Sequence, residues 1–263
     1  MSRLAETFAQ LKREGRRGFI PFITAGDPDL ETTRALILEL ARAGATLVEL
    51  GVPFSDPMAD GPVIQRASER ALKNCVGVAD VLSVVADVRG ETGVPVVLFS
   101  YYNPLLQFGP ERLCREARRA GVDGMLVTDL IPEEAGAFAR TLREHDLDFI
   151  FLVAPTSTDA RLRMIAELAS GFIYAVSRAG VTGAQSSVSD EAARLVSRAR
   201  QVTDLPIAVG FGLSTRDQLA EVWRYADAAV VGSAIVAELE RLSGEPDLVS
   251  QVGDFARSLL PSD

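Results

Sequence analysis

Short apolar segments alternate with amphipathic segments along the whole chain. The apolar segments are rich in β-branched residues and are bounded by Gly, Pro or polar residues, a pattern that predicts buried strands. They occupy residues 18–24, 46–50, 95–100, 124–128, 149–153, 172–176, 206–209 and 228–231. Because each segment is almost continuously apolar, the pattern favours parallel strands covered by helices.

The segments between these strands show the apolar period of helices that cover a sheet. The clearest of them occupy residues 30–42, 79–89, 111–120, 132–144, 159–169, 189–200 and 215–225. Capping residues such as Ser157-Thr158-Asp159 precede several of them. We also predict an extra N-terminal helix at 3–14, before the first strand, and an added helix near 63–72.

Strand–helix units repeated from end to end predict an α/β fold. The most economical architecture is a (β/α)8 TIM barrel, one domain over residues 1–263, with long loops after strands 2 and 6. The alternative is an open doubly wound sheet, but eight evenly spaced units favour closure. Such barrels place their chemistry at the C-terminal ends of the strands, so the residues that follow each strand are the candidates.

The acidic composition narrows the classes of partner. A formal net charge of −9 argues against nucleic acid or an anionic membrane as the main partner. The cysteines, Cys75 and Cys114, and the single histidine, His145, provide no zinc or iron–sulfur spacing. With no apolar signal core at the N-terminus, we expect a cytoplasmic protein with reduced cysteines and no metal.

One carboxylate, Glu49, lies at the end of the second predicted strand. Burial disfavours the charged form of an acid, so a Glu in such a strand is paired, protonated or used in chemistry. A buried ion pair is the structural alternative. The loop that follows carries Asp56 and Asp60. Asp60 alone fits a turn, but beside Glu49 it indicates two acids with different protonation tasks; Asp56 fits a turn or a partner contact.

Glycines follow the seventh and eighth strands, at Gly210-Phe211-Gly212 and Gly232-Ser233. Loops at these two places commonly hold phosphate in barrels, although tight turns alone would also need glycine. The GxGxxG spacing of a dinucleotide site is absent. The sixth loop, residues 177–187, has the small residues of a lid over the substrate, and an ordinary loop explains its composition equally well.

Apolar and aromatic residues near the strand ends could line a pocket for a flat ring, or could simply be barrel core. They are Phe22, Leu98, Tyr101, Leu126, Val153, Tyr174 and Phe211.

Five motifs, taken together, resemble the tryptophan synthase α subunit family over nearly the whole chain. They are PFITAGDP at 21–28, ELGVPFSDPMADGP at 49–62, YYNP at 101–104, SRAGVTG at 177–183 and GFG at 210–212. The acidic block at 49–62 is by far the most specific. No proposed catalytic position departs from the family pattern.

The resemblance implies a retro-aldol lyase reaction, the cleavage of indole-3-glycerol phosphate to indole and glyceraldehyde 3-phosphate, with no cofactor in this chain. Glu49 would be the general acid and base, and Asp60 would bind the indole N–H. By the same resemblance Tyr174 accompanies Glu49, whereas Arg178 and Thr182 lie on the lid, where Thr182 meets Asp60 on closure. The implied indole pocket consists of Phe22, Leu98, Tyr101, Leu126 and Phe211, and the implied phosphate contacts are Gly183, Gly212, Gly232 and Ser233.

The resemblance also implies a partner, a β subunit that carries pyridoxal phosphate in an α2β2 heterotetramer. Indole would pass to it through a tunnel for L-tryptophan synthesis, and the loops at 53–57 and 101–104 would face it. Three alternatives remain open: a stand-alone indole-3-glycerol phosphate lyase, another phosphate-binding barrel such as a sugar-phosphate epimerase, and a subunit that only activates β. Intact Glu49 and Asp60 argue against the last.

Overall fold

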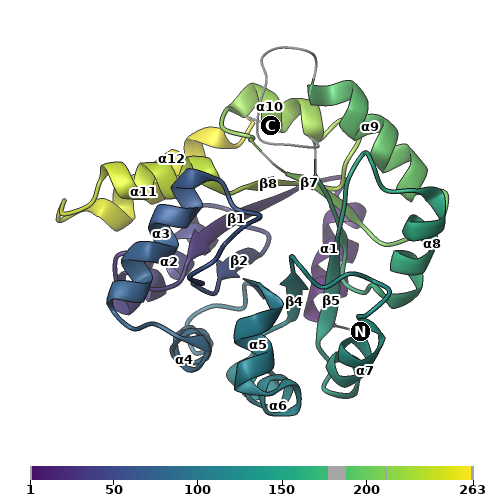
Figure 1. The fold of residues 1–263 in the computed structure, drawn as a ribbon. Coiled ribbons are helices and arrows are strands. Elements are labelled where there is room, and N and C mark those ends of the chain that lie inside the picture. The colour runs from purple at the N-terminus through teal and green to yellow at the C-terminus, as the bar shows by residue number, and fades with distance from the viewer. Residues whose placement is uncertain (1, 177–187, 211, 262–263) are drawn as a thin grey trace.

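Eight parallel strands close into one barrel, with the helices of each unit outside it (Figure 1). The computed structural model describes residues 2–176, 188–210 and 212–261. The strands are β1 Gly18–Thr24, β2 Val48–Gly51, β3 Val96–Ser100, β4 Gly124–Val127, β5 Asp148–Val153, β6 Ile173–Val176, β7 Ile207–Gly210 and β8 Ala228–Val231. Neighbours pair in chain order and β8 pairs with β1. The predicted (β/α)8 class is confirmed, and the open doubly wound sheet is excluded.

The helices follow the predicted order with local differences. They are α1 Arg3–Glu14, α2 Leu30–Arg42, α3 Pro62–Lys73, α4 Val78–Val88, α5 Tyr102–Phe108, α6 Pro110–Ala120, α7 Gly136–Glu144, α8 Asp159–Leu168, α9 Val188–Ala199, α10 Arg216–Val222, α11 Ser233–Arg241 and α12 Leu248–Leu259. The helix predicted from residue 132 begins only at Gly136, because Glu134 and Ala135 donate to the Ile131 carbonyl in a separate turn.

Three of these helices, α5, α11 and α12, were not among the predicted segments. The short helix α5 contains Pro104 in its first turn, where the backbone N–H groups need no intrahelical partner, so proline is tolerated there. The sequence around it nevertheless resembles a loop. The longer α12 packs against α2 and α11 on the outside of the barrel.

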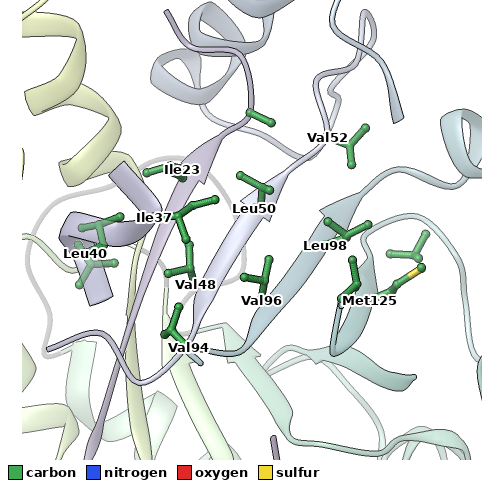
Figure 2. Close-up of a cluster of buried hydrophobic side chains, with 14 of the residues drawn as sticks. Ile23, Ile37, Leu40, Val48, Leu50, Val52, Val94, Val96, Leu98 and Met125 are labelled. Carbon is green, nitrogen blue, oxygen red and sulfur yellow. The ribbon is translucent and has the colours of Figure 1, made fainter. Parts of the chain in front are cut away.

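Two apolar layers hold the barrel together. The inner layer fills the barrel with side chains such as Ile20, Val97 and Phe172, and α1 adds Phe8 beneath them, 5.6 Å from Phe172 between ring centroids. The outer layer lies between strands and helices, and Figure 2 shows part of it where α2 packs on the strands. Because α1 fills the N-terminal end of the barrel, the C-terminal end is left for a cavity.

None of the helices described is both long and apolar enough to cross a membrane.

Candidate active site

A cavity of 340 Å³ opens at the C-terminal end of the barrel. Its wall is mostly apolar and combines the ends of several strands with the first turn of α3 and the start of α11. The lining residues are Phe22, Glu49, Ala59, Asp60, Gly61, Pro62, Val63, Ile64, Phe99, Thr128, Leu152, Tyr174, Val176, Gly212, Val230, Gly232 and Ser233. Both predicted acids and both predicted glycine sites therefore meet in one place.

Glu49 projects from β2 into this cavity between the neighbouring strands. Its register partners are Phe22 on β1 and Val97 on β3, both apolar. The residue is 1% exposed, and its Oε1 has no hydrogen-bond partner among the described residues. Desolvation raises the pKa of Glu49 to about 8. The carboxyl group is therefore protonated at neutral pH, and no ion pair holds it within the part of the chain that the structure describes.

Tyr174 reaches the same cavity from β6 and is buried. Burial raises the pKa of the Tyr174 phenol well above its ordinary value, and Glu49, which is ionised at the alkaline pH where a phenol titrates, adds to this effect. Its hydroxyl fits only because residue 210 is glycine: a Cβ on Gly210 would lie 2.3 Å from that oxygen. Tyr174 thus stays a neutral hydrogen-bond donor beside the acid.

Asp60 enters the cavity from the loop before α3. The Tyr101 hydroxyl donates to its Oδ2 at 3.1 Å and accepts from the backbone N–H of Ala59 at 2.8 Å. On the other side, the Gln65 amide donates to the Asp60 carbonyl at 2.9 Å. Desolvation raises the pKa of Asp60 to about 6, and the bond from Tyr101 partly opposes it. The carboxylate is oriented by Tyr101 and is ionised at neutral pH.

The two acids differ in protonation because their surroundings differ. Glu49 has apolar neighbours, whereas Asp60 is half-buried and hydrogen-bonded. A cavity with a neutral acid and an ionised acid can donate a proton at one point and stabilise positive charge at another. The third acid of this region, Asp56, is exposed, accepts from the Ser55 hydroxyl at 2.5 Å and does not line the cavity.

The part of the wall that follows β7 and β8 can hold an anion. Gly232 and Ser233 lie where α11 begins, so the first backbone N–H groups of this helix have no intrahelical acceptor. Gly212 has a φ of +79°, a backbone conformation that side chains rarely adopt, and a Cβ there would meet nothing within 4 Å. This arrangement of glycines and a helix N-terminus fits a phosphate group.

Some predicted positions cannot be placed on this wall. Phe211, together with Arg178, Thr182 and Gly183 of the sixth loop, lies outside the described residues.

The structure corrects the prediction for Leu98, which does not line the cavity. Successive side chains of a strand point to opposite sides, and Val97 points inward because it is in register with Glu49. Leu98 consequently points outward and packs with Leu50 and Met125 (Figure 2). Phe99, the next inward residue, lines the cavity and contacts Phe22 edge-on with centroids 5.2 Å apart.

Leu126 and Tyr101 also occupy places other than the cavity wall. Leu126 is fully buried in the inner layer and is not among the residues that line the cavity. Tyr101 acts through Asp60, and its ring packs on Phe54 at 5.1 Å between centroids. Residues that the sequence did not single out complete the wall, all of them apolar except Thr128: Val63, Ile64, Phe99, Thr128, Leu152, Val176 and Val230. Their position near strand ends is a signal in the sequence for Phe99, Leu152 and Val176, but which of them point into the barrel follows only from the strand register.

The described residues contain no group of three or more His, Cys, Asp or Glu side chains that could hold a metal ion.

Comparisons with known proteins agree on one family. Residues 8–258 match the model of the tryptophan synthase alpha chain family. Tryptophan synthase alpha chains from Geobacter sp. strain M21 and Geobacter sulfurreducens are 50% and 51% identical over 259 residues. The alignments cover 98% of this chain and, respectively, 97% and 98% of those chains.

Solved structures give the same result. The tryptophan synthase alpha subunit of Legionella pneumophila has 36% identity and a TM-score of 0.89, with 98% of this chain and 97% of that chain covered. A chain of Mycobacterium tuberculosis tryptophan synthase in its aminoacrylate-bound form has 37% identity and a TM-score of 0.87, covering 98% of this chain and 100% of that chain.

Proposed function

This chain belongs to the tryptophan synthase alpha chain family, whose role is the cleavage of indole-3-glycerol phosphate, and from that premise we propose how its residues carry out the reaction. The observation that carries the proposal is Glu49, a buried acid without a hydrogen-bond partner among the described residues, in the same cavity as Asp60 and the start of α11. The reaction is a carbon–carbon lyase reaction of the retro-aldol type.

The cavity suits both ends of the substrate. The indole ring occupies the apolar part between Phe22, Phe99 and Leu152, which excludes water from the reacting carbon. The phosphate binds the N–H groups at Gly212, Gly232 and Ser233, where the dipole of α11 favours negative charge. The family resemblance predicts a further contact from Gly183, which lies outside the described residues. Two anchored ends hold the C3–C3′ bond beside Glu49.

Glu49 transfers the proton in both halves of the reaction. The protonated carboxyl group first donates its proton to indole C3, so that the ring carries positive charge shared with its nitrogen. The Glu49 carboxylate then takes the proton of the C3′ hydroxyl while the C3–C3′ bond breaks. The bonding electrons return to the ring, C3′ becomes the aldehyde carbon, and Glu49 is again protonated.

Asp60 stabilises the charge that develops between these two steps. Its carboxylate accepts a hydrogen bond from the indole N–H. Because this interaction strengthens as the ring becomes positive, it favours the transition state over the bound substrate. The hydrogen bond from Tyr101 holds the carboxylate in place. All of these groups are side chains or backbone atoms of the chain itself, and we propose that it works without a cofactor of its own.

We further propose a β subunit as partner, in an α2β2 complex that works in the cytoplasm, with pyridoxal phosphate on the partner. Support comes from the family and from apolar side chains left exposed around the mouth of the barrel. Met58 is 89% exposed, and Leu106 and Ile131 are also exposed. A stand-alone lyase with the same catalytic residues is the second candidate.

The pH dependence of cleavage tests the proposed division of labour. Asp60 must be ionised and Glu49 protonated, so kcat/KM should rise as pH increases through about 6 and fall as it passes about 8. The measurement is indole release from indole-3-glycerol phosphate between pH 5 and 10. The substrate phosphate itself titrates at about pH 6. The inhibition constant of glycerol 3-phosphate, measured over the same pH range, is the control for this titration. A kcat/KM that still rises above pH 9 would contradict the role of Glu49 as the acid.

A further inference from the structure

A network of ion pairs outside the cavity joins the loop after β1 to two helices, α3 and α11, whose first turns line the cavity. Arg70 of α3 holds Asp27 with two bonds, Nε to Oδ1 at 2.7 Å and Nη2 to Oδ2 at 2.8 Å. The third nitrogen of Arg70 donates to Glu240 of α11 at 2.6 Å. Arg66, one turn earlier in α3, holds the same Glu240 with two bonds of 2.8 and 2.6 Å. The network thus connects the loop after β1, helix α3 and helix α11.

The anchor of this network is rigid. Asp27 is 2% exposed, and its backbone N–H donates to the Thr24 carbonyl at the end of β1. The adjacent Gly26 N–H donates to the Thr33 hydroxyl on α2 at 2.9 Å. A planar guanidinium that binds a fixed carboxylate through two bonds also fixes its own orientation. Arg70 therefore positions α3 along its axis as well as toward the barrel.

Helix α3 otherwise has few apolar contacts that could fix its position. Its buried side chains are small, Ala67, Ser68 and Ala71. Ala67 packs with Phe22 and Val236 in a small cluster, against which the partly buried Val63 and Ile64 of the first turn also pack. Helix α11, in contrast, buries the larger Ile235, Val236 and Leu239 and also packs against β1 and α12. Loss of the network should loosen α3 more than α11.

The position of α3 determines the position of Asp60. The helix begins at Pro62, two residues after Asp60, and Gln65 of its second turn donates to the Asp60 carbonyl. Val63 and Ile64 of its first turn line the cavity. A displacement of α3 would thus move the carboxylate relative to the ring that it serves, while the phosphate site at the start of α11 stays in place.

We propose that Arg70 is a positioning residue for the cleavage reaction, acting through helix α3 on Asp60 from its ion pairs with Asp27 and Glu240. This inference rests on the proposed function. Arg70 lines no part of the cavity and is distinct from the groups that touch the substrate.

The test compares Arg70→Met with a matched control, Arg89→Met. Arg89 is another partly buried arginine, paired at 3.0 Å with the buried Asp123, but it lies at the N-terminal end of the barrel. We expect Arg70→Met to lower kcat for indole release at least tenfold per folded molecule, with the inhibition constant of glycerol 3-phosphate changed less than threefold. Arg89→Met should lower the melting temperature and leave kcat within twofold of wild type. Equal kcat values for the two variants would overturn the proposal.

A second readout separates positioning from a general structural role. If Arg70 acts through Asp60, the tenfold effect should disappear when Arg70→Met is made in an Asp60→Asn background, because the carboxylate that it positions is gone. An unchanged tenfold effect in that background would overturn the proposal.

Glu240→Gln covers the case that Arg70→Met does not fold, since it keeps the buried Asp27 pair intact. Glu240→Gln should lower kcat about threefold when made in the wild-type chain and not at all when made in the Asp60→Asn background. A Glu240→Gln variant whose kcat equals that of wild type would overturn the proposal.

Wild-type protein is assayed first. Absence of indole release by wild type would reject the proposed function, whereas an active wild type with a fully active Arg70→Met would reject only this inference.

Discussion

Glu49→Gln should abolish indole release, lowering kcat by about 10³-fold or more, within the range of 10²–10⁴ typical of general acid–base catalysis. Gln has the size of the protonated Glu, but it can neither donate a proton to indole C3 nor accept one from the C3′ hydroxyl. The pKa of Glu49 is raised to about 8 by burial, so the wild-type side chain is also neutral at pH 7. The variant should therefore fold like wild type, and the measurement is indole release at saturating substrate.

Two controls make this result specific. Binding of glycerol 3-phosphate to Glu49→Gln should persist, because the proposed phosphate contacts are backbone N–H groups at Gly212 and the start of α11 and do not include Glu49. Asp148→Asn changes another buried acid, at the N-terminal end of β5, and should leave cleavage within a few fold of wild type. Wild-type turnover by Glu49→Gln would remove Glu49 from the mechanism.

Asp60→Asn should lower kcat by about 10²–10³-fold, the size of effect found when a group that stabilises transition-state charge is removed. The amide keeps the shape of the side chain and a carbonyl oxygen that can accept from the Tyr101 hydroxyl. In the wild-type chain this hydroxyl donates to Asp60 Oδ2 at 3.1 Å. The amide cannot offset the positive charge of the protonated ring. KM should change much less than kcat, because the carboxylate serves the transition state more than the bound substrate.

Asp56→Asn is the matched control for this variant. Asp56 belongs to the same loop, but its carboxylate is exposed and bonded to Ser55. Assayed without a partner subunit, Asp56→Asn should cleave at the wild-type rate. A mild effect of Asp60→Asn, comparable to that of Asp56→Asn, would reduce Asp60 to a residue that shapes the loop.

The fold was predictable because its pattern is local and repeated. Each strand is apolar on both faces, and the helices between strands carry their own period and caps, so closure of eight units follows from the order of elements. Glu49 was predictable for the same reason, as a charged residue at the end of a segment that burial would otherwise keep apolar.

The continuous apolarity that identifies the strands also hides which of their side chains point into the barrel and which point outward. Residues 95–100 are apolar on both faces, so nothing in that segment tells whether Leu98 or Phe99 points into the barrel. Only the register of β3 with Glu49 decides it. The wall contributed by α3 and the network through Arg70 depend on the contacts that Arg70 makes with Asp27 and Glu240, which are far apart in sequence. Arg178, Thr182, Gly183 and Phe211 stay predictions.

Indole formation from indole-3-glycerol phosphate, with and without a β subunit, tests the central claim most directly. We expect the purified chain to release indole and glyceraldehyde 3-phosphate in equal amounts, slowly alone and at least tenfold faster with an equimolar β subunit that co-elutes with it. Full activity that the β subunit does not change would identify a stand-alone lyase. No indole under either condition would contradict the assignment of this cavity to carbon–carbon cleavage.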